Sequence, residues 1–154
     1  MKKYIFLFVL PFFIHSCTSD EGKPTNENDY LIFGHFYGFC GGEECIEVFK
    51  LTDTNLYEDS EDNYALDTFN FEEKEIEKFN LAKDLVFFLP AKLLTEKDDV
   101  LGCPDCSDGG GVYIEYSKNG IKNSWRIDQF KQNIPEYLHD FIDKVNEKIS
   151  LINK

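Results

Sequence analysis

The stretch that decides the fold runs from Gly111 to Asp128 and reads GVYIEYSKNGIKNSWRID. Asn119-Gly120 at its middle is typical of a type I′ turn, which joins two antiparallel strands. Apolar residues recur with a period of two on both sides of this turn, as they do in strands with one buried face. They are Val112, Ile114 and Tyr116 before the turn, and Ile121, Trp125 and Ile127 after it. The pattern predicts a β-hairpin that turns one face toward a core.

Further strands are predicted upstream of this hairpin. The segment Tyr30–Phe39 is dense in aromatic and branched residues, which favours a central strand with apolar residues on both faces. The turn-forming residues 52–54 separate Cys45–Leu51 from Asn55–Asp59, so these two segments are expected to form a second hairpin. Residues 60–67 are polar and predict a surface loop.

A helix is predicted over Phe71–Leu94, with Pro90 as its stop and a short extra turn through Ala91–Leu94. Acidic residues precede the segment, where they favour the positive end of a helix dipole. Its apolar residues have helical spacing. They are Ile76, Phe79, Ala82, Leu85, Val86 and Leu89.

The last helix is predicted to start near Pro135 and to carry one apolar stripe against a charged back. The stripe consists of Leu138, Phe141, Ile142, Val145 and Ile149. The order of elements is thus strand, hairpin, helix, hairpin, helix. This order predicts an α+β fold, with an antiparallel sheet of about five strands and two amphipathic helices on one face.

The N-terminal residues 1–16, MKKYIFLFVLPFFIHS, have the layout of a signal peptide, with two lysines before a short apolar run. The run is too short to span a bilayer, so cleavage is expected. Residues 14–17, Ile-His-Ser-Cys, resemble the lipobox of bacterial lipoproteins, which implies a lipid on Cys17 and therefore attachment to a membrane. The alternative is ordinary cleavage that leaves Cys17 as a spare thiol.

The polar residues 17–29 are expected to form a flexible acidic tether, followed by a single globular domain over residues 30–154. Ser19-Asp20-Glu21 resembles the acidic export signal of bacterial surface lipoproteins. The protein is therefore expected in the cell envelope, at the outer membrane. Both surface display and a periplasm-facing anchor stay open.

The formal charge of the chain is −13, and loss of the two lysines within residues 1–16 would bring it to about −15. A surface of this charge repels the phosphates of nucleic acid. No basic stripe with interleaved aromatic residues is present in the sequence. A nucleic-acid partner is therefore not expected.

Four cysteines remain when Cys17 is set aside, namely Cys40, Cys45, Cys103 and Cys106. An even number in an exported chain favours disulfides, and four cysteines allow three pairings. Local pairing, Cys40 with Cys45 and Cys103 with Cys106, is preferred to pairing between the two halves. The alternative is a zinc site with four thiolate ligands, because Cys103-Pro-Asp-Cys106 resembles a zinc knuckle. Thiol exchange is disfavoured because no helix follows this motif to lower a thiol pKa.

The loop after Cys103 is the candidate binding loop, with Asp105, Asp108, Gly109 and Gly110 as its candidate residues. Irregular loops on a rigid scaffold often carry function, and aromatic residues such as Tyr37 and Phe39 are expected nearby. The acidic residues match no calcium loop, so a solvated turn is preferred to a cation site. No catalytic motif is present in the sequence, and we expect the protein not to be an enzyme.

Three segments together resemble a group of small exported or lipid-anchored bacterial proteins with an early cysteine pair and a later Gly-Cys-Pro-Asp-Cys-x-Asp-Gly-Gly loop. The segments are GFCGGEEC (38–45), GCPDCSDGGGVYIEY (102–116) and IPEYLHDFIDKV (134–145). The resemblance implies the fold and the export, and it transfers no functional residue.

The sequence as a whole predicts a membrane-anchored, exported lipoprotein without cofactor. The domain is expected to be a non-enzymatic binding or structural module of the cell envelope, with a protein, peptide or glycan as partner. The alternative is a zinc-binding envelope domain that uses Cys40, Cys45, Cys103 and Cys106 as ligands.

Overall fold

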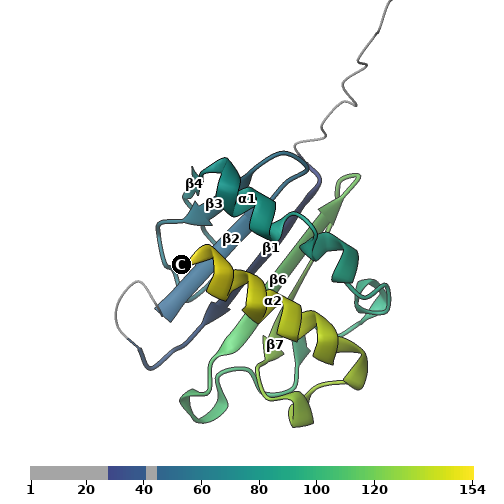
Figure 1. The fold of residues 1–154 in the computed structure, drawn as a ribbon. Coiled ribbons are helices and arrows are strands. Elements are labelled where there is room, and N and C mark those ends of the chain that lie inside the picture. Colours follow the sequence, from purple (N-terminus) through teal and green to yellow (C-terminus); the bar gives the residue numbers. More distant parts are fainter. Residues whose placement is uncertain (1–27, 41–44) are drawn as a thin grey trace, which may run out of the picture.

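The strand β1 (Tyr30–Phe36) lies at the centre of a seven-stranded sheet with the order β4-β3-β2-β1-β6-β7-β5. The computed structural model describes residues 28–40 and 45–154, so the predicted signal peptide and Cys17 lie outside the described residues. Figure 1 shows the sheet with both α-helices packed across it. The predicted α+β class is therefore confirmed, as is the central position of the first strand.

Both predicted hairpins are present. The first joins β2 (Ile46–Leu51) to β3 (Leu56–Asp59), and the second joins β6 (Gly111–Lys118) to β7 (Ile121–Asp128). Asn119 and Gly120 have φ angles of 52° and 80°, and positive values at both central residues define a type I′ turn. The Asn119-Gly120 signal therefore predicted the position of the turn in the second hairpin correctly.

The expected number of strands was too low, and the sheet is not purely antiparallel. Two short edge strands, β4 (Phe71–Glu73) and β5 (Val100–Leu101), bring the sheet to seven strands. Strand β5 runs parallel to β7, whereas every other pair is antiparallel. Strands of three and two residues are too short to show a period in the sequence.

The prediction of a single helix over Phe71–Leu94 is wrong. Phe71 is in β4, and the helix α1 spans only Ile76–Ala82. The chain continues as two 3₁₀ helices, η2 (Leu85–Phe88) and η3 (Leu93–Thr95), on either side of Pro90. Apolar spacing alone does not show such breaks. Of the predicted stripe, Ala82 and Leu85 are buried, but Ile76 is exposed.

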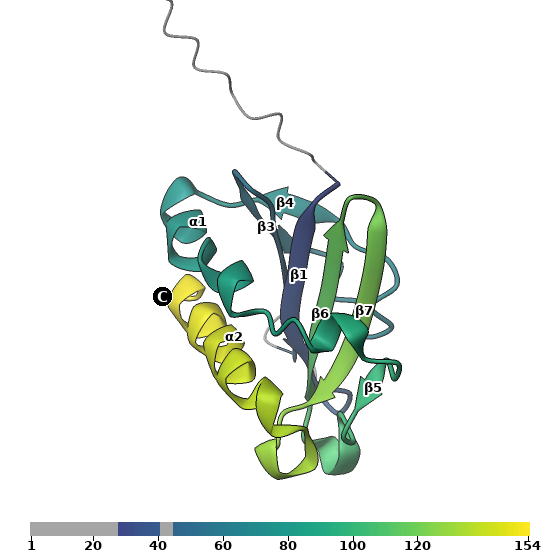
Figure 2. The ribbon, with the colours of Figure 1, turned by 90° about the vertical axis from the view of Figure 1, so that its right-hand side faces the viewer.

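The predicted last helix is confirmed as α2 (His139–Ile152), which follows the short 3₁₀ helix η6 (Glu136–Leu138). All five residues of its predicted apolar stripe are buried. Figure 2 shows that α1 and α2 lie on the same face of the sheet, as expected. Neither helix of the described residues is long and apolar enough to cross a membrane.

The two faces of the sheet have separate cores. The larger core lies between the sheet and the helices, and it contains Phe33, Trp125 and Phe141. The smaller core lies on the opposite face, where Phe36 and Val48 pack with Leu66 of the loop between β3 and β4. Residues of β1 contribute to both cores, since neighbouring residues of a strand point to opposite faces.

Candidate functional site

The candidate binding loop lies at one end of the sheet, together with the other loops of that end. The register pairs Phe36 with Gly111 and Gly111 with Asp128, so the loops that adjoin these residues meet. We call this surface the distal rim and define it as residues 37–40, 45, 64, 102–110 and 128–133. The first described residues lie at the opposite end of β1, about 20 Å away for a seven-residue strand. Figure 2 shows the two ends at the top and bottom of the molecule.

Two disulfides belong to the distal rim. Cys40 is bonded to Cys45 and Cys103 to Cys106, with Cα–Cα distances of 5.6 and 5.5 Å. The predicted local pairing is thus confirmed. In the described part of the chain, no group of three or more histidine, cysteine or acidic side chains is arranged to hold a metal ion. The zinc alternative would therefore need reduced thiols and a different arrangement of both loops.

Asp105 connects three segments of the distal rim. Its Oδ2 atom accepts hydrogen bonds from the Gly38 amide at 3.0 Å and from the Tyr64 hydroxyl at 2.8 Å. Its Oδ1 atom accepts one from the Gly110 amide at 3.1 Å, and its own amide donates to the Gly110 carbonyl at 2.7 Å. The loop after β1, the loop after β3 and the Cys103 loop are therefore held by one carboxylate.

These hydrogen bonds change the acidity of both partners. Burial raises the pKa of the Asp105 carboxyl, but the donors Tyr64, Gly38 and Gly110 together lower it below its ordinary value. The hydrogen bond to Asp105 in turn raises the pKa of the Tyr64 hydroxyl. Both pKa shifts favour the same arrangement, in which the ionised Asp105 carboxylate accepts a hydrogen bond from the protonated Tyr64 hydroxyl.

The two candidate glycines are in close contact with aromatic rings. A Cβ atom at Gly110, whose φ is 71°, would lie 2.2 Å from the ring of Tyr37. A Cβ atom at Gly109 would lie 2.7 Å from the ring of Phe130. The glycines therefore allow aromatic residues to cover the loop. Asp108 is exposed on the loop surface, and Asp105 is the acid that organises the backbone.

Asp128 is a second organising carboxylate, and no motif in the sequence marks it. It is only 1% exposed. Its oxygens accept hydrogen bonds from the Cys103 amide at 3.0 Å, the Phe130 amide at 2.8 Å and the Asn133 side chain at 2.8 Å. A buried charge needs such partners. Asp128 thus ties the end of β7 to the Cys103 loop and to the segment that leads to α2.

Exposed aromatic side chains lie on the segments that the two carboxylates hold. Phe39 is 85% exposed, Phe130 is 48% exposed, and Tyr64 is exposed as well. Tyr37, which accepts a hydrogen bond from the Gln129 side chain at 2.9 Å, is partly buried. Large aromatic side chains on a well-supported surface are common anchors for binding partners.

The two histidines of the described chain have structural partners. The Nε2 atom of His35 lies 2.6 Å from a carboxylate oxygen of Glu47, its neighbour on β2, and burial lowers the pKa of His35. The Nε2 atom of His139 lies 3.0 Å from the carbonyl oxygen of Lys131. Neither contact pairs a histidine with a hydroxyl or thiol nucleophile.

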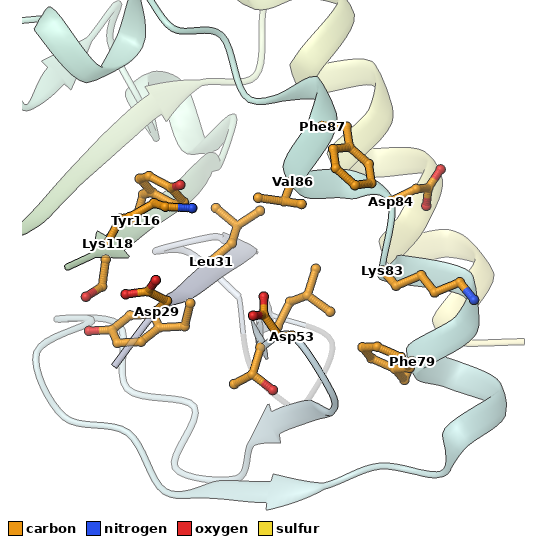
Figure 3. A pocket seen from close by; sticks show the side chains of 14 residues that line it. Asp29, Leu31, Asp53, Phe79, Lys83, Asp84, Val86, Phe87, Tyr116 and Lys118 are labelled. Carbon is orange, nitrogen blue, oxygen red and sulfur yellow. The ribbon is translucent and has the colours of Figure 1, made fainter. Parts of the chain in front are cut away.

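A groove that the sequence did not indicate lies at the other end of the sheet (Figure 3). It has a volume of about 840 Å³ and runs between the end of the sheet and the segment from α1 to η2. We call it the tether-end groove. Its lining residues are Asp29, Tyr30, Leu31, Leu51, Thr52, Asp53, Phe79, Lys83, Asp84, Val86, Phe87, Tyr116, Ser117 and Lys118. These residues come from four separate segments, 29–31, 51–53, 79–87 and 116–118, so no local motif marks the groove.

Comparison with known proteins gives no match, either to a protein family or to a curated protein.

The state of the cysteines can be measured by intact mass with and without a reductant. Two disulfides predict that the unreduced protein is about four daltons lighter than the reduced protein, with no bound zinc by elemental analysis. Equal masses together with one zinc per chain would contradict the local pairing and support the four-thiolate alternative.

Replacement of Asp105 by alanine is expected to lower the free energy of unfolding by about 1 kcal/mol or more, because three donors lose their acceptor. Asp108→Ala is the matched control, because Asp108 is exposed and its φ of 57° is close to the 61° of Asp105, so both alanine variants have the same backbone strain. The loss in Asp105→Ala should exceed that in the control by about 1 kcal/mol. Urea unfolding measures both. Equal losses in the two variants would contradict the role of Asp105.

The contribution of Asp105 to the free energy of unfolding should depend on pH. Because the folded-state pKa of Asp105 is lowered, its stabilisation is fully present above the ordinary pKa and is lost as the pH falls through the lowered value. Asp105→Asn should therefore flatten the loss of stability between about pH 5 and pH 2. An unchanged acid dependence in this variant would mean that Asp105 does not contribute to it.

Proposed function

We propose that the protein is an exported lipoprotein, anchored in a membrane of the cell envelope through lipid on Cys17, and that its domain is a non-enzymatic binding module. The distal rim is the proposed partner surface. The observation that carries the proposal is the position of the rim, at the end of β1 opposite to residue 28. A lipid on Cys17 would therefore attach one end of the domain to the membrane, and the distal rim would lie at the other end.

The length of the connecting segment supports this geometry. Twelve residues from Cys17 to Asn28 can span about 40 Å when fully extended. The acidic tether and the negative charge of the chain suit a soluble domain held outside an anionic bilayer. The proposed location is the outer membrane, with the domain on the cell surface.

The chemistry of the distal rim supports a binding role. Phe39, Phe130 and Tyr64 offer apolar ring faces, and disulfides and carboxylates hold the backbone beneath them. Preorganised loops lose little conformational entropy on binding. Aromatic faces of this kind pack against apolar side chains of proteins and peptides, and against the C–H groups of sugars. The partner class is therefore a protein, a peptide or a glycan.

The anchor can be tested with Cys17→Ser in the native host. The unchanged protein should fractionate with membranes and have an intact mass that includes acyl chains, whereas the variant should lack this mass. Protease treatment of whole cells then reports whether the domain lies on the surface. A wild-type protein that carries no lipid would contradict the proposed anchor.

The binding surface can be tested with Phe39→Ala and Phe130→Ala, and Ile121→Ala is the matched control. Ile121 is also an exposed apolar residue, but it follows the β6–β7 turn at the opposite end of the sheet. The probes are an array of bacterial and host glycans and a library of envelope peptides. Ligands of the wild type should lose at least tenfold in affinity with the rim variants only. Equal binding by all variants would place the partner surface elsewhere.

A further inference from the structure

The tether-end groove has an apolar floor. Leu31 and Leu51 are buried at the end of the central strands, and Phe79 and Val86 come from the helical segment above them. Tyr116 of β6 contributes a further partly buried ring. Figure 3 shows these side chains around the groove, with Phe87 on its helical side. Phe87 is 85% exposed, so a large apolar ring stands uncovered beside an apolar floor.

The charges around this floor do not favour an ionic ligand. Asp84 forms an ion pair with Lys148 at 2.6 Å, and this hydrogen bond lowers the pKa of the Asp84 carboxyl. Asp29 accepts a hydrogen bond from the Asn119 amide at 2.8 Å. Among the lining residues, acidic and basic side chains occur together. An uncharged apolar group suits this lining better than an anion or a cation does.

The first described residues of the chain lie at the edge of the groove. The carbonyl oxygen of Asn28 accepts a hydrogen bond from the Ser117 hydroxyl at 2.6 Å, and Ser117 lines the groove together with Asp29 and Tyr30. Cys17 is eleven residues away from Asn28 along the chain, a reach of at most about 40 Å. A group attached to Cys17 is therefore held near the groove at a high effective concentration, in the millimolar range for a short flexible linker.

We propose that the tether-end groove binds one alkyl chain of the lipid on Cys17 while the protein is outside a bilayer. This inference rests on the lipidation in the proposed function. In the bilayer the alkyl chain is already in hydrocarbon and gains nothing from the groove. In water, contact with the apolar floor and Phe87 removes alkyl surface from solvent, which is favourable in proportion to the area buried. The groove thus shields part of the anchor of a lipoprotein in transit.

The test uses the mature chain made without lipid, in which Cys17 is the one cysteine outside the two disulfides. One sample is labelled at Cys17 with N-hexadecylmaleimide and the other with N-ethylmaleimide, and their amide NMR spectra are compared. The hexadecyl sample is expected to be monomeric, with shifts at Leu31, Val86 and Tyr116. Absence of these shifts, or self-association through exposed alkyl chains, would overturn the inference.

Two variants locate the alkyl chain. Val86→Glu places a carboxylate on the groove floor and should abolish the hexadecyl-dependent shifts, whereas Ile121→Glu outside the groove should keep them. Phe87→Ala removes only an exposed ring, so it leaves the fold intact even if Val86→Glu does not fold. In the N-ethylmaleimide sample of this variant, whose groove holds no tethered chain, free dodecanoate should bind with at least threefold lower affinity than in the same sample of the wild type. Equal affinity would mean that Phe87 does not contact an alkyl chain in the groove.

Failure of the groove to bind an alkyl chain can be distinguished from failure of the proposed lipid anchor. Lipidation in cells is read from the intact mass of protein extracted from membranes, whereas occupation of the groove is read from the chemically labelled chain. A protein without lipid in cells but with hexadecyl-dependent shifts would contradict only the proposed anchor. A lipidated protein without such shifts would contradict only the groove.

Discussion

Two carboxylates, Asp105 and Asp128, hold one end of the sheet together, and the candidate partner surface depends on them. Asp105 accepts hydrogen bonds from two segments that are distant in the sequence and from Gly110 of its own loop. Asp128 joins β7 to the Cys103 loop and to the segment that leads to α2. These hydrogen bonds are exposed or partly buried, so each contributes about 0.5–1.5 kcal/mol, the usual net value of an intramolecular hydrogen bond. The disulfides close short loops, whereas the carboxylates connect one loop to another.

Strand β1 connects the two ends of the domain on which the proposals rest. It is paired on both edges and buried on both faces, so the rest of the domain holds it on every side. One end receives the chain from the proposed anchor and borders the groove. The other end leads into the first disulfide and the distal rim. The point at which the proposed tether joins the domain and the proposed partner surface are thus separated by the length of one strand.

The sequence predicted those parts of the fold that depend on local patterns. Both hairpins, the central strand and α2 have a clear period or turn signal, such as Asn119-Gly120. It did not predict β5, which is held by pairing with β7 across a long sequence separation, nor the break after Ala82. The role of Asp105 depends on its hydrogen bonds with Gly38 and Tyr64. The groove depends on the approach of Leu31 and Val86, which are distant in the sequence. Such contacts exist only after folding, and no spacing rule encodes them.

Carboxylates, more than disulfides, set the shape of the distal rim. This dependence can be measured by native-state hydrogen exchange of the amides of Cys103 and Gly110, which donate to Asp128 and Asp105. It is measured in the oxidised protein, in the same protein after mild reduction, and in Asp128→Ala. Protection should survive reduction of both disulfides and should be lost at Cys103 in the variant. Loss of protection on reduction, with protection retained in Asp128→Ala, would contradict the claim.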